Sequence, residues 1–161
     1  MKAFTSAPSG AAGTTEFRIG YQKDGKPISP WHDIPYKEGS FYHTVIEIPK
    51  YTKAKLEIST KEPLNPIAQD IKKGKLRDYH GPIFWNYGAI PQTWENPNVV
   101  HPEVHCKGDN DPVDVVEIGS AVIPAGTVIK VCLICIYPIC VVPRLMFSTI
   151  NSRPRFWESL L

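Results

Sequence analysis

The sequence predicts a mainly β fold, and two observations lead to this prediction. Sixteen prolines stand beside 11 glycines, a composition that favours strands and turns over long helices. Ala54, Leu56 and Ile58 alternate with Lys55 and Glu57, which is the period of a strand with one apolar and one charged face. At 161 residues, with 42% hydrophobic and 21% charged residues, the chain is long enough for one globular domain.

The first elements are an arm and a hairpin. Residues 1–16 are mostly Ser, Thr, Gly and Ala, and we expect a flexible arm without a signal peptide or membrane anchor. Residues 17–22 fit a first strand, which the turn sequence from Asp24 to Pro27 ends.

The middle of the chain predicts one short helix and several further strands. Between residues 65 and 77, Pro66 can start a helix and Gly74 can stop it, so we expect at most a short helical turn. Residues 83–92, 113–118 and 127–131 are apolar or alternating and read as strands.

The composition changes at Lys130. Of 18 basic and 16 acidic residues, only Arg144, Arg153, Arg155 and Glu158 follow it. The apolar run from 131 to 142 is too short for a bilayer and contains Pro138, so we predict no membrane span. We divide the chain into the arm (1–16), a β-rich domain (17–130) and an apolar tail (131–161).

The net charge and the cysteine positions limit the classes of binding partner and the cellular location that we expect. A net charge of +2 is too small to indicate nucleic acid or an anionic membrane. Three of the four cysteines crowd into the apolar tail, unlike the spread of a secreted disulfide framework. We expect reduced thiols in the cytoplasm, with a mitochondrial location as the minor alternative.

The strongest chemical signal is the segment GDNDPVDVVEIG, which places Asp109, Asp111 and Asp114 within six residues. Such close carboxylates repel one another unless cations neutralise them, and hard oxygen ligands select Mg²⁺, Mn²⁺ or Ca²⁺. A solvated acidic turn is the alternative. An EF-hand is excluded, because Asp114 stands where that loop needs Gly and Ser120 where it needs Glu.

A second group of residues suits a small polyanion. Lys53, Lys55 and Glu57 share one strand face, which taken alone is typical of a solvated surface. With Arg77 and Tyr87 the set offers ammonium groups, a planar guanidinium and a phenol donor.

Five ordered segments resemble the soluble (type I) inorganic pyrophosphatases of the eukaryotic branch, from about residue 17 to about residue 130. They are KDGKPISPWHDIP, VIEIPKYTKAKLEI, EPLNPIAQDIKKGKLR, WNYGAIPQTWENP and GDNDPVDVVEIG. The resemblance implies a five-stranded barrel similar to an oligonucleotide-binding barrel, with short flanking helices and an incomplete C-terminus. It also implies Mg²⁺ as cofactor, with Mn²⁺ as the alternative, inorganic diphosphate as substrate and a homodimer.

The resemblance also implies roles for individual residues. Asp111 matches the carboxylate that orients and deprotonates the attacking water. The matching acidic positions that face the metals are Asp109, Asp114, Glu57 and Glu47. The matching phosphate-binding positions are Lys55, Arg77 and Tyr87.

The sequence departs from the family at two places. Ile83 stands where a phosphate-facing Tyr is usual, in a shortened loop. The family's second acidic cluster cannot be found after Lys130, so we expect an inorganic diphosphatase with little activity. The alternative is a non-catalytic, truncated product that binds metal weakly or associates with full-length subunits.

Overall fold

The structure is a computed structural model that describes residues 4–100, 102 and 105–132, and its regular elements are all strands. The strands are β1 (Thr5–Ser9), β2 (Arg18–Lys23), β3 (Lys26–Ile28), β4 (Lys37–Glu38), β5 (Phe41–Ile48), β6 (Leu56–Ile58), β7 (Ile67–Gln69), β8 (Ile71–Lys72), β9 (Lys75–Leu76), β10 (Asn86–Ala89), β11 (Asp114–Glu117) and β12 (Val128–Val131). The prediction of a mainly β fold is confirmed. The flanking helices are not found among the described residues.

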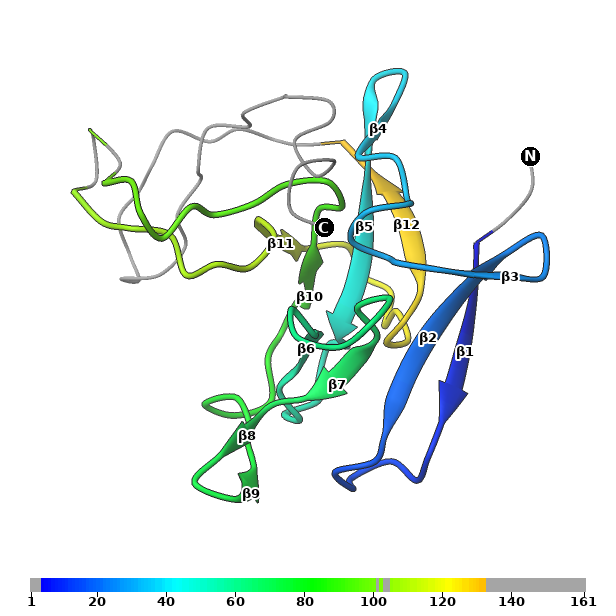
Figure 1. Cartoon of the computed structure of the whole chain (residues 1–161), viewed down its shortest axis with the longest axis vertical. Coiled ribbons are helices and arrows are strands. Elements are labelled where there is room, and N and C mark those ends of the chain that lie inside the picture. Colours follow the sequence, from blue (N-terminus) through cyan, green and yellow to red (C-terminus); the bar gives the residue numbers. More distant parts are fainter. Residues whose placement is uncertain (1–3, 101, 103–104, 133–161) are drawn as a thin grey trace.

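Two curled antiparallel sheets form the body of the molecule (Figure 1). The first has the order β1-β2-β7-β6, with β3 paired to β2, and the second has the order β11-β10-β5-β12, with β4 paired to β5. The β8–β9 hairpin extends from the first sheet. The long strand β5 carries the second sheet, because both β10 and β12 pair with it.

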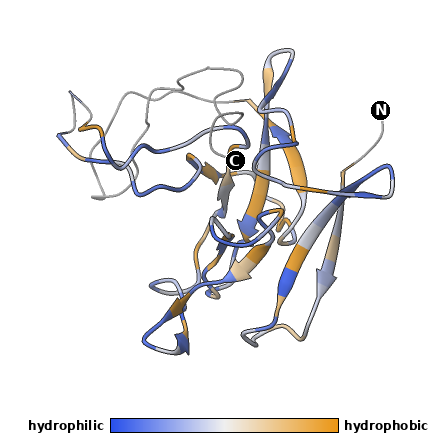
Figure 2. Ribbon diagram, viewed as in Figure 1, coloured by the Kyte–Doolittle hydropathy of each residue, from blue (hydrophilic) through white to orange (hydrophobic). Residues whose placement is uncertain are grey.

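The apolar core lies between these sheets. Its members come from both of them and from the segment after β3; they are Ile19, Tyr21, Trp31, Ile34, Val45, Leu56, Ile58, Ile67 and Ala89. Figure 2 shows hydrophobic residues along β5 and β12 and alternating hydrophobic and polar residues along β2. In β6 and β7 the buried residues alternate with partly buried ones, as expected for strands with one face in the core.

One buried carboxylate joins the two sheets. Glu47 of β5 is 4% exposed, and its Oε1 accepts a hydrogen bond of 2.8 Å from the backbone N–H of Ile58 in β6. This bond links β5 to β6, which share no backbone pairing.

Asn86 is a second fixed point, at the start of β10. Its side chain is fully buried and all four of its hydrogen-bonding positions are used. Oδ1 accepts the N–H groups of Lys50 and Ile123, while Nδ2 donates to Glu117 Oε2 and to the Ala121 carbonyl. A satisfied buried amide specifies one arrangement of its neighbours, so Asn86 holds β5, β10 and β11 in register.

The segment from residue 65 to 77 is extended, and the expected helical turn is wrong. Ile67 and Gln69 are both buried and flank the less buried Ala68, so the burial has the period of a strand. The Lys73-Gly74 pair has positive φ angles of 53° and 74°, which is the geometry of a two-residue hairpin turn. Gly74 therefore turns the β8–β9 hairpin and does not end a helix.

The two chain ends differ from the expectations in different ways. Thr5–Ser9 form β1 and pair antiparallel with β2 from Arg18 to Gln22, so this part of the expected flexible arm is ordered, because the β2 edge offers backbone partners. Apart from Val131 and Cys132, the apolar tail lies outside the described residues. No helix suited to crossing a membrane occurs in the part of the chain that the structure describes.

We predict that Gly88→Ala is strongly destabilising and that Gly20→Ala is not. A Cβ on Gly88 in β10 would overlap the Val45 carbonyl of β5, whereas a Cβ on Gly20 in β2 meets only the Ala7 carbonyl oxygen at 3.7 Å. We expect Gly88→Ala to lower the free energy of unfolding by about 3 kcal/mol or more and Gly20→Ala to change it by less than about 1 kcal/mol. Urea unfolding followed by circular dichroism measures both; equal effects would contradict the close approach of β5 and β10.

Candidate active site

The acidic loop that precedes β11 is held by a neighbouring segment of backbone. Glu95 N–H donates to the Asp111 carbonyl at 2.9 Å, Asn110 N–H donates to the Glu95 carbonyl at 3.0 Å, and Gly108 N–H donates to the Asn96 carbonyl at 3.2 Å. These bonds cross-link residues 95–96 to residues 108–111. The carboxylates of the loop therefore project from a fixed backbone.

Two local features set the turn inside this loop. Asn110 has a φ of 76°, a left-handed conformation that asparagine tolerates better than most residues, and its Oδ1 accepts a hydrogen bond of 3.0 Å from Trp94 Nε1. Gly108 lies so close to the backbone of Glu95 that a side chain would not fit. The turn brings the Asp111 N–H to 3.3 Å from Asp109 Oδ1.

Strands β5, β10 and β11 place three predicted site residues together. In β10, Tyr87 lies opposite Val116, and its phenol and the Asp114 carboxylate of β11 lie close enough to shift each other's pKa. On the other side of β10, Tyr87 pairs with Ile48 and Gly88 pairs with Ile46, so Glu47 is the extra residue of a β-bulge. Bulges redirect a side chain beside functional sites, and this one sets Glu47 apart from the regular alternation of β5.

The carboxylates of the site repel one another. Burial raises the pKa of Asp111 to about 6, with further contributions from Asp109 and Glu57. Burial also raises the pKa of Asp114 to about 6, and Asp109 and Glu57 add to this rise while Tyr87 and Lys55 oppose it. Three further carboxylates thus act on the same small volume as Asp111, and their negative charge is only partly compensated.

Glu47 lies within the same electrostatic field. Burial and the neighbouring Asp114 raise the pKa of Glu47 well above its ordinary value, although the hydrogen bond from Ile58 N–H opposes the rise. Burial and Asp114 also raise the pKa of the Tyr87 phenol. Tyr87 is therefore a donor at neutral pH.

The predicted cations border this acidic group. Lys55 Nζ pairs with the Glu57 carboxylate and lies 3.6 Å from Asp70 Oδ2. Arg77 Nη1 donates to the same Asp70 oxygen at 2.8 Å. Burial opposes the charge of Lys55, but Glu57 and Asp70 outweigh it and raise the pKa of the ammonium group. Positive and negative groups thus meet along one side of the cluster.

The donor set fits a hard, largely hydrated divalent cation. Among the described residues, no three His, Cys, Asp or Glu side chains are close enough to enclose a metal ion by themselves. Mg²⁺ does not need such a cage, because it keeps several waters and is often bound through one or two carboxylates. The mutual repulsion of Asp109, Asp111 and Asp114 is what a bound cation would relieve.

The structure thus brings all eight predicted site residues into one connected group and separates Lys53 from it. Lys53 instead pairs with Asp78 at 3.0 Å on an exposed edge. Ile83, which the resemblance places where a phosphate-facing tyrosine is expected, is 1% exposed, and its side chain lies in the interior.

Two acidic residues of the site were missed from the sequence. Glu95 is 8% exposed, and burial together with Asp109 and Asp114 raises its pKa to about 7. Asp70 contacts both predicted phosphate-binding cations. In the sequence, Glu95 is visible only as an acid directly after Trp94, and Asp70 only as an acid seven positions before Arg77. Each pattern is also typical of an ordinary surface carboxylate.

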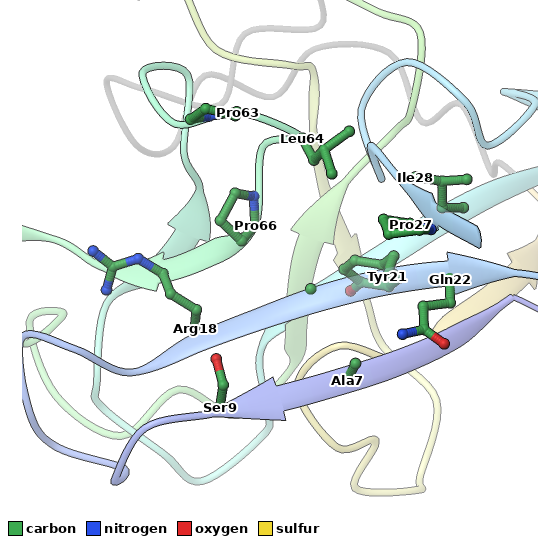
Figure 3. Close-up of a pocket in the computed structure, with 11 residues that line it drawn as sticks. Ala7, Ser9, Arg18, Tyr21, Gln22, Pro27, Ile28, Pro63, Leu64 and Pro66 are labelled. Carbon is green, nitrogen blue, oxygen red and sulfur yellow. The ribbon is translucent and has the colours of Figure 1, made fainter. Parts of the chain in front are cut away.

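A cavity of about 260 Å³ lies elsewhere, between strands β1, β2 and β3 and the turn before β7. Figure 3 shows Pro27, Leu64 and Pro66 around it, with Arg18 at one end. Arg18 already donates to the Glu62 carboxylate at 2.8 and 2.9 Å. None of the predicted site residues lines this cavity.

The amino-acid sequence matches proteins of one family. A family model described as inorganic pyrophosphatase matches residues 44–140, and the match continues past Lys130. An inorganic pyrophosphatase of Zygosaccharomyces bailii is 52% identical over 137 residues, which are 80% of this chain and 47% of that protein. One of Drosophila melanogaster is 49% identical over 140 residues, covering 81% and 41%. The chain spans about half the length of the curated relatives it matches.

Solved structures of the same family have a similar fold. The type I inorganic pyrophosphatase of Toxoplasma gondii superimposes with a TM-score of 0.76 at 44% identity, covering 81% of this chain and 60% of that one. A vacuolar soluble pyrophosphatase of Trypanosoma cruzi, truncated at its N-terminal domain and solved in complex with PPi, gives 0.74 at 41% identity, covering 81% and 56%.

We predict that the protein loses stability between about pH 4 and about pH 6 when divalent cations are chelated. The pKa values of Asp111 and Asp114, raised from 3.8 to about 6, mean that the folded protein holds these protons more tightly than the unfolded chain. Their contribution to stability is fully present below pH 3.8 and is lost as the pH rises through about 6. We expect the melting temperature to fall by on the order of 5 °C over this window.

An Asp114→Asn variant is the matched comparison, because it keeps the shape and removes the charge. His32, whose pKa is lowered by burial, changes stability in the opposite direction, but it does so equally in both proteins. We expect Asp114→Asn to have the flatter profile in thermal unfolding with a chelator. Parallel profiles for the two proteins would show that Asp114 does not carry the repulsion.

Proposed function

Because this chain belongs to the inorganic pyrophosphatase family, we propose that it takes part in the Mg²⁺-dependent hydrolysis of inorganic diphosphate to two phosphates. The observation that carries the proposal is the contact between an acidic cluster and a cation pair, in which Lys55 bridges Glu57 and Asp70. Diphosphate is a compact polyanion, and its attack by a water oxygen requires positive charge on the approach and on the leaving phosphate.

In this proposal, four carboxylates hold the divalent cations. They are Asp109, Asp114, Glu57 and Glu47. A bound cation would supply positive charge and lower the pKa of water toward neutrality. Tyr87 lies beside Asp114, and Ile58 N–H keeps Glu47 oriented at 2.8 Å.

Asp111 is the proposed general base. Its carboxylate accepts a proton from the attacking water while the water oxygen forms a bond to one phosphorus atom. The bond from that phosphorus to the bridging oxygen breaks, and the second phosphate leaves with the electron pair. A pKa of Asp111 near 6 suits a group that accepts a proton at neutral pH.

Lys55, Arg77 and Tyr87 are the proposed phosphate-binding residues. Lys55 offers a point charge, Arg77 a planar set of donors and Tyr87 a phenol O–H. Burial and the nearby Asp114 keep the phenol protonated, so that it donates to phosphate oxygens without adding negative charge.

The proposal also covers the oligomeric state and the cellular location of the protein. A homodimer and a reducing, cytoplasmic location follow from the family resemblance and from the free thiols of Cys106 and Cys132. Sedimentation analysis tests the dimer. The alternative, a non-catalytic protein that binds cations weakly, predicts cation binding without phosphate release.

We predict divalent affinity in the millimolar range that depends on Asp109 and Asp114, because few carboxylates and many waters form an open site. Calorimetric titration of Mg²⁺ or Mn²⁺ into the wild type, Asp114→Ala and Asp109→Ala should give weaker binding in both variants. Asp78→Asn, which removes only the exposed partner of Lys53, is the control. Equal binding in all four proteins would place the cation elsewhere.

We predict that Asp111→Asn lowers phosphate release from diphosphate by about a hundredfold or more and changes Mg²⁺ affinity by only about twofold. A phosphate assay with and without Mg²⁺ measures the first effect, and the cation titration measures the second. Unchanged phosphate release would remove Asp111 from the role of base. Absence of any Mg²⁺-dependent release from the wild type would favour the non-catalytic alternative.

A further inference from the structure

Asp70 occupies a central position between the two proposed phosphate-binding cations. It lies between β7 and β8, and its Oδ2 is 2.8 Å from Arg77 Nη1 and 3.6 Å from Lys55 Nζ. One carboxylate oxygen thus contacts a guanidinium and an ammonium group that belong to different segments of the chain. Neither the family resemblance nor the sequence pattern assigned a role to Asp70.

The backbone of the same three residues forms a closed ring of hydrogen bonds. Asp70 N–H donates to the Lys55 carbonyl at 2.8 Å, Arg77 N–H donates to the Asp70 carbonyl at 2.8 Å, and Lys55 N–H donates to the Arg77 carbonyl at 3.0 Å. The fold therefore places these residues together through the main chain. The Asp70 carboxylate takes no part in this ring and contacts the side chains of Lys55 and Arg77 instead.

Two adjacent cations do not stay together without a counter-charge. Arg77 disfavours the charged form of Lys55, as expected for like charges at short range. Asp70 is ionised at neutral pH, because Arg77 and Lys55 lower its pKa despite its partial burial. Its bond to Nη1 also anchors one end of the Arg77 guanidinium. Within the described residues this is the one side-chain hydrogen bond recorded for Arg77, so its remaining N–H donors stay available.

We propose that Asp70 is a positioning residue that holds Lys55 and Arg77 as one prearranged receptor for the phosphate groups of the substrate. This inference rests on the proposed function, because it assumes that the two cations bind phosphate. Prearranged groups bind more tightly because less ordering accompanies binding. Lys53 and Asp78 provide a built-in comparison, since they form an ion pair of 3.0 Å on the exposed edge, with 65% and 47% exposed side chains.

The test measures the affinity for inorganic phosphate, with and without Mg²⁺, by calorimetric titration of the full chain. Positioning and simple masking of charge predict opposite results for Asp70→Asn, which removes the negative charge and keeps the shape. If Asp70 positions the cations, phosphate affinity falls by about tenfold. If it only masks them, the loss of a negative charge tightens phosphate binding.

We expect Asp70→Asn to weaken phosphate binding by about tenfold, Asp70→Glu to weaken it less, and Asp78→Asn to leave it unchanged. Unchanged or tighter binding in Asp70→Asn would overturn the proposal. If Asp70→Asn does not fold, as judged by circular dichroism, Asp70→Ser, which also removes the negative charge, decides by the same criterion. Lys55→Gln and Arg77→Gln distinguish failure of the proposed phosphate site from failure of the role of Asp70. If neither variant weakens phosphate binding, the proposed phosphate site is wrong. If both variants weaken it and Asp70→Asn does not, only the role proposed for Asp70 is wrong.

Discussion

The hydrogen bond from Ile58 N–H to the Glu47 carboxylate is the interaction on which both the fold and the site depend. It joins β5 to β6 at 2.8 Å where the two sheets have no backbone pairing. A buried carboxylate is costly unless its oxygens are paired. Glu47 is paired on one oxygen by the fold and faces the charge of Asp114. The same side chain therefore closes the sheets and contributes to the electrostatics of the site.

Around this contact the protein combines rigid packing with unrelieved repulsion. Asn86 satisfies four backbone and side-chain partners at the start of β10, and Gly88 lets β10 approach β5. The loop that carries Asp109 and Asp111 is held separately, by backbone hydrogen bonds to residues 95–96. Asp111 and Asp114 thus keep their raised pKa values, a form of stored strain that is typical of functional sites.

The side of the site that is proposed to bind phosphate is organised differently. There, each cation already has an acidic partner: Lys55 has Glu57 and Asp70, and Arg77 has Asp70. A polyanion that enters must compete with these partners, so binding depends on geometry as much as on net charge. The carboxylates around Asp111 and Asp114 lack enough positive charge to balance them, whereas Lys55 and Arg77 are held in place by acidic partners. This arrangement suits a substrate that binds together with cations.

The sequence by itself determined the β class, the strands near Ile19, Leu56, Val115 and Ile129, and the chemistry of the acidic loop, because alternation and short motifs are local properties. Its ordered motifs also indicated the family. Only the tertiary structure decided that residues 65–77 are extended, since their pairing partners lie in β2, β6 and within a hairpin. The positions of Asp70 and Glu95 beside the site could not be predicted for the same reason: a lone acid acquires significance only from the charged groups that distant segments bring beside it.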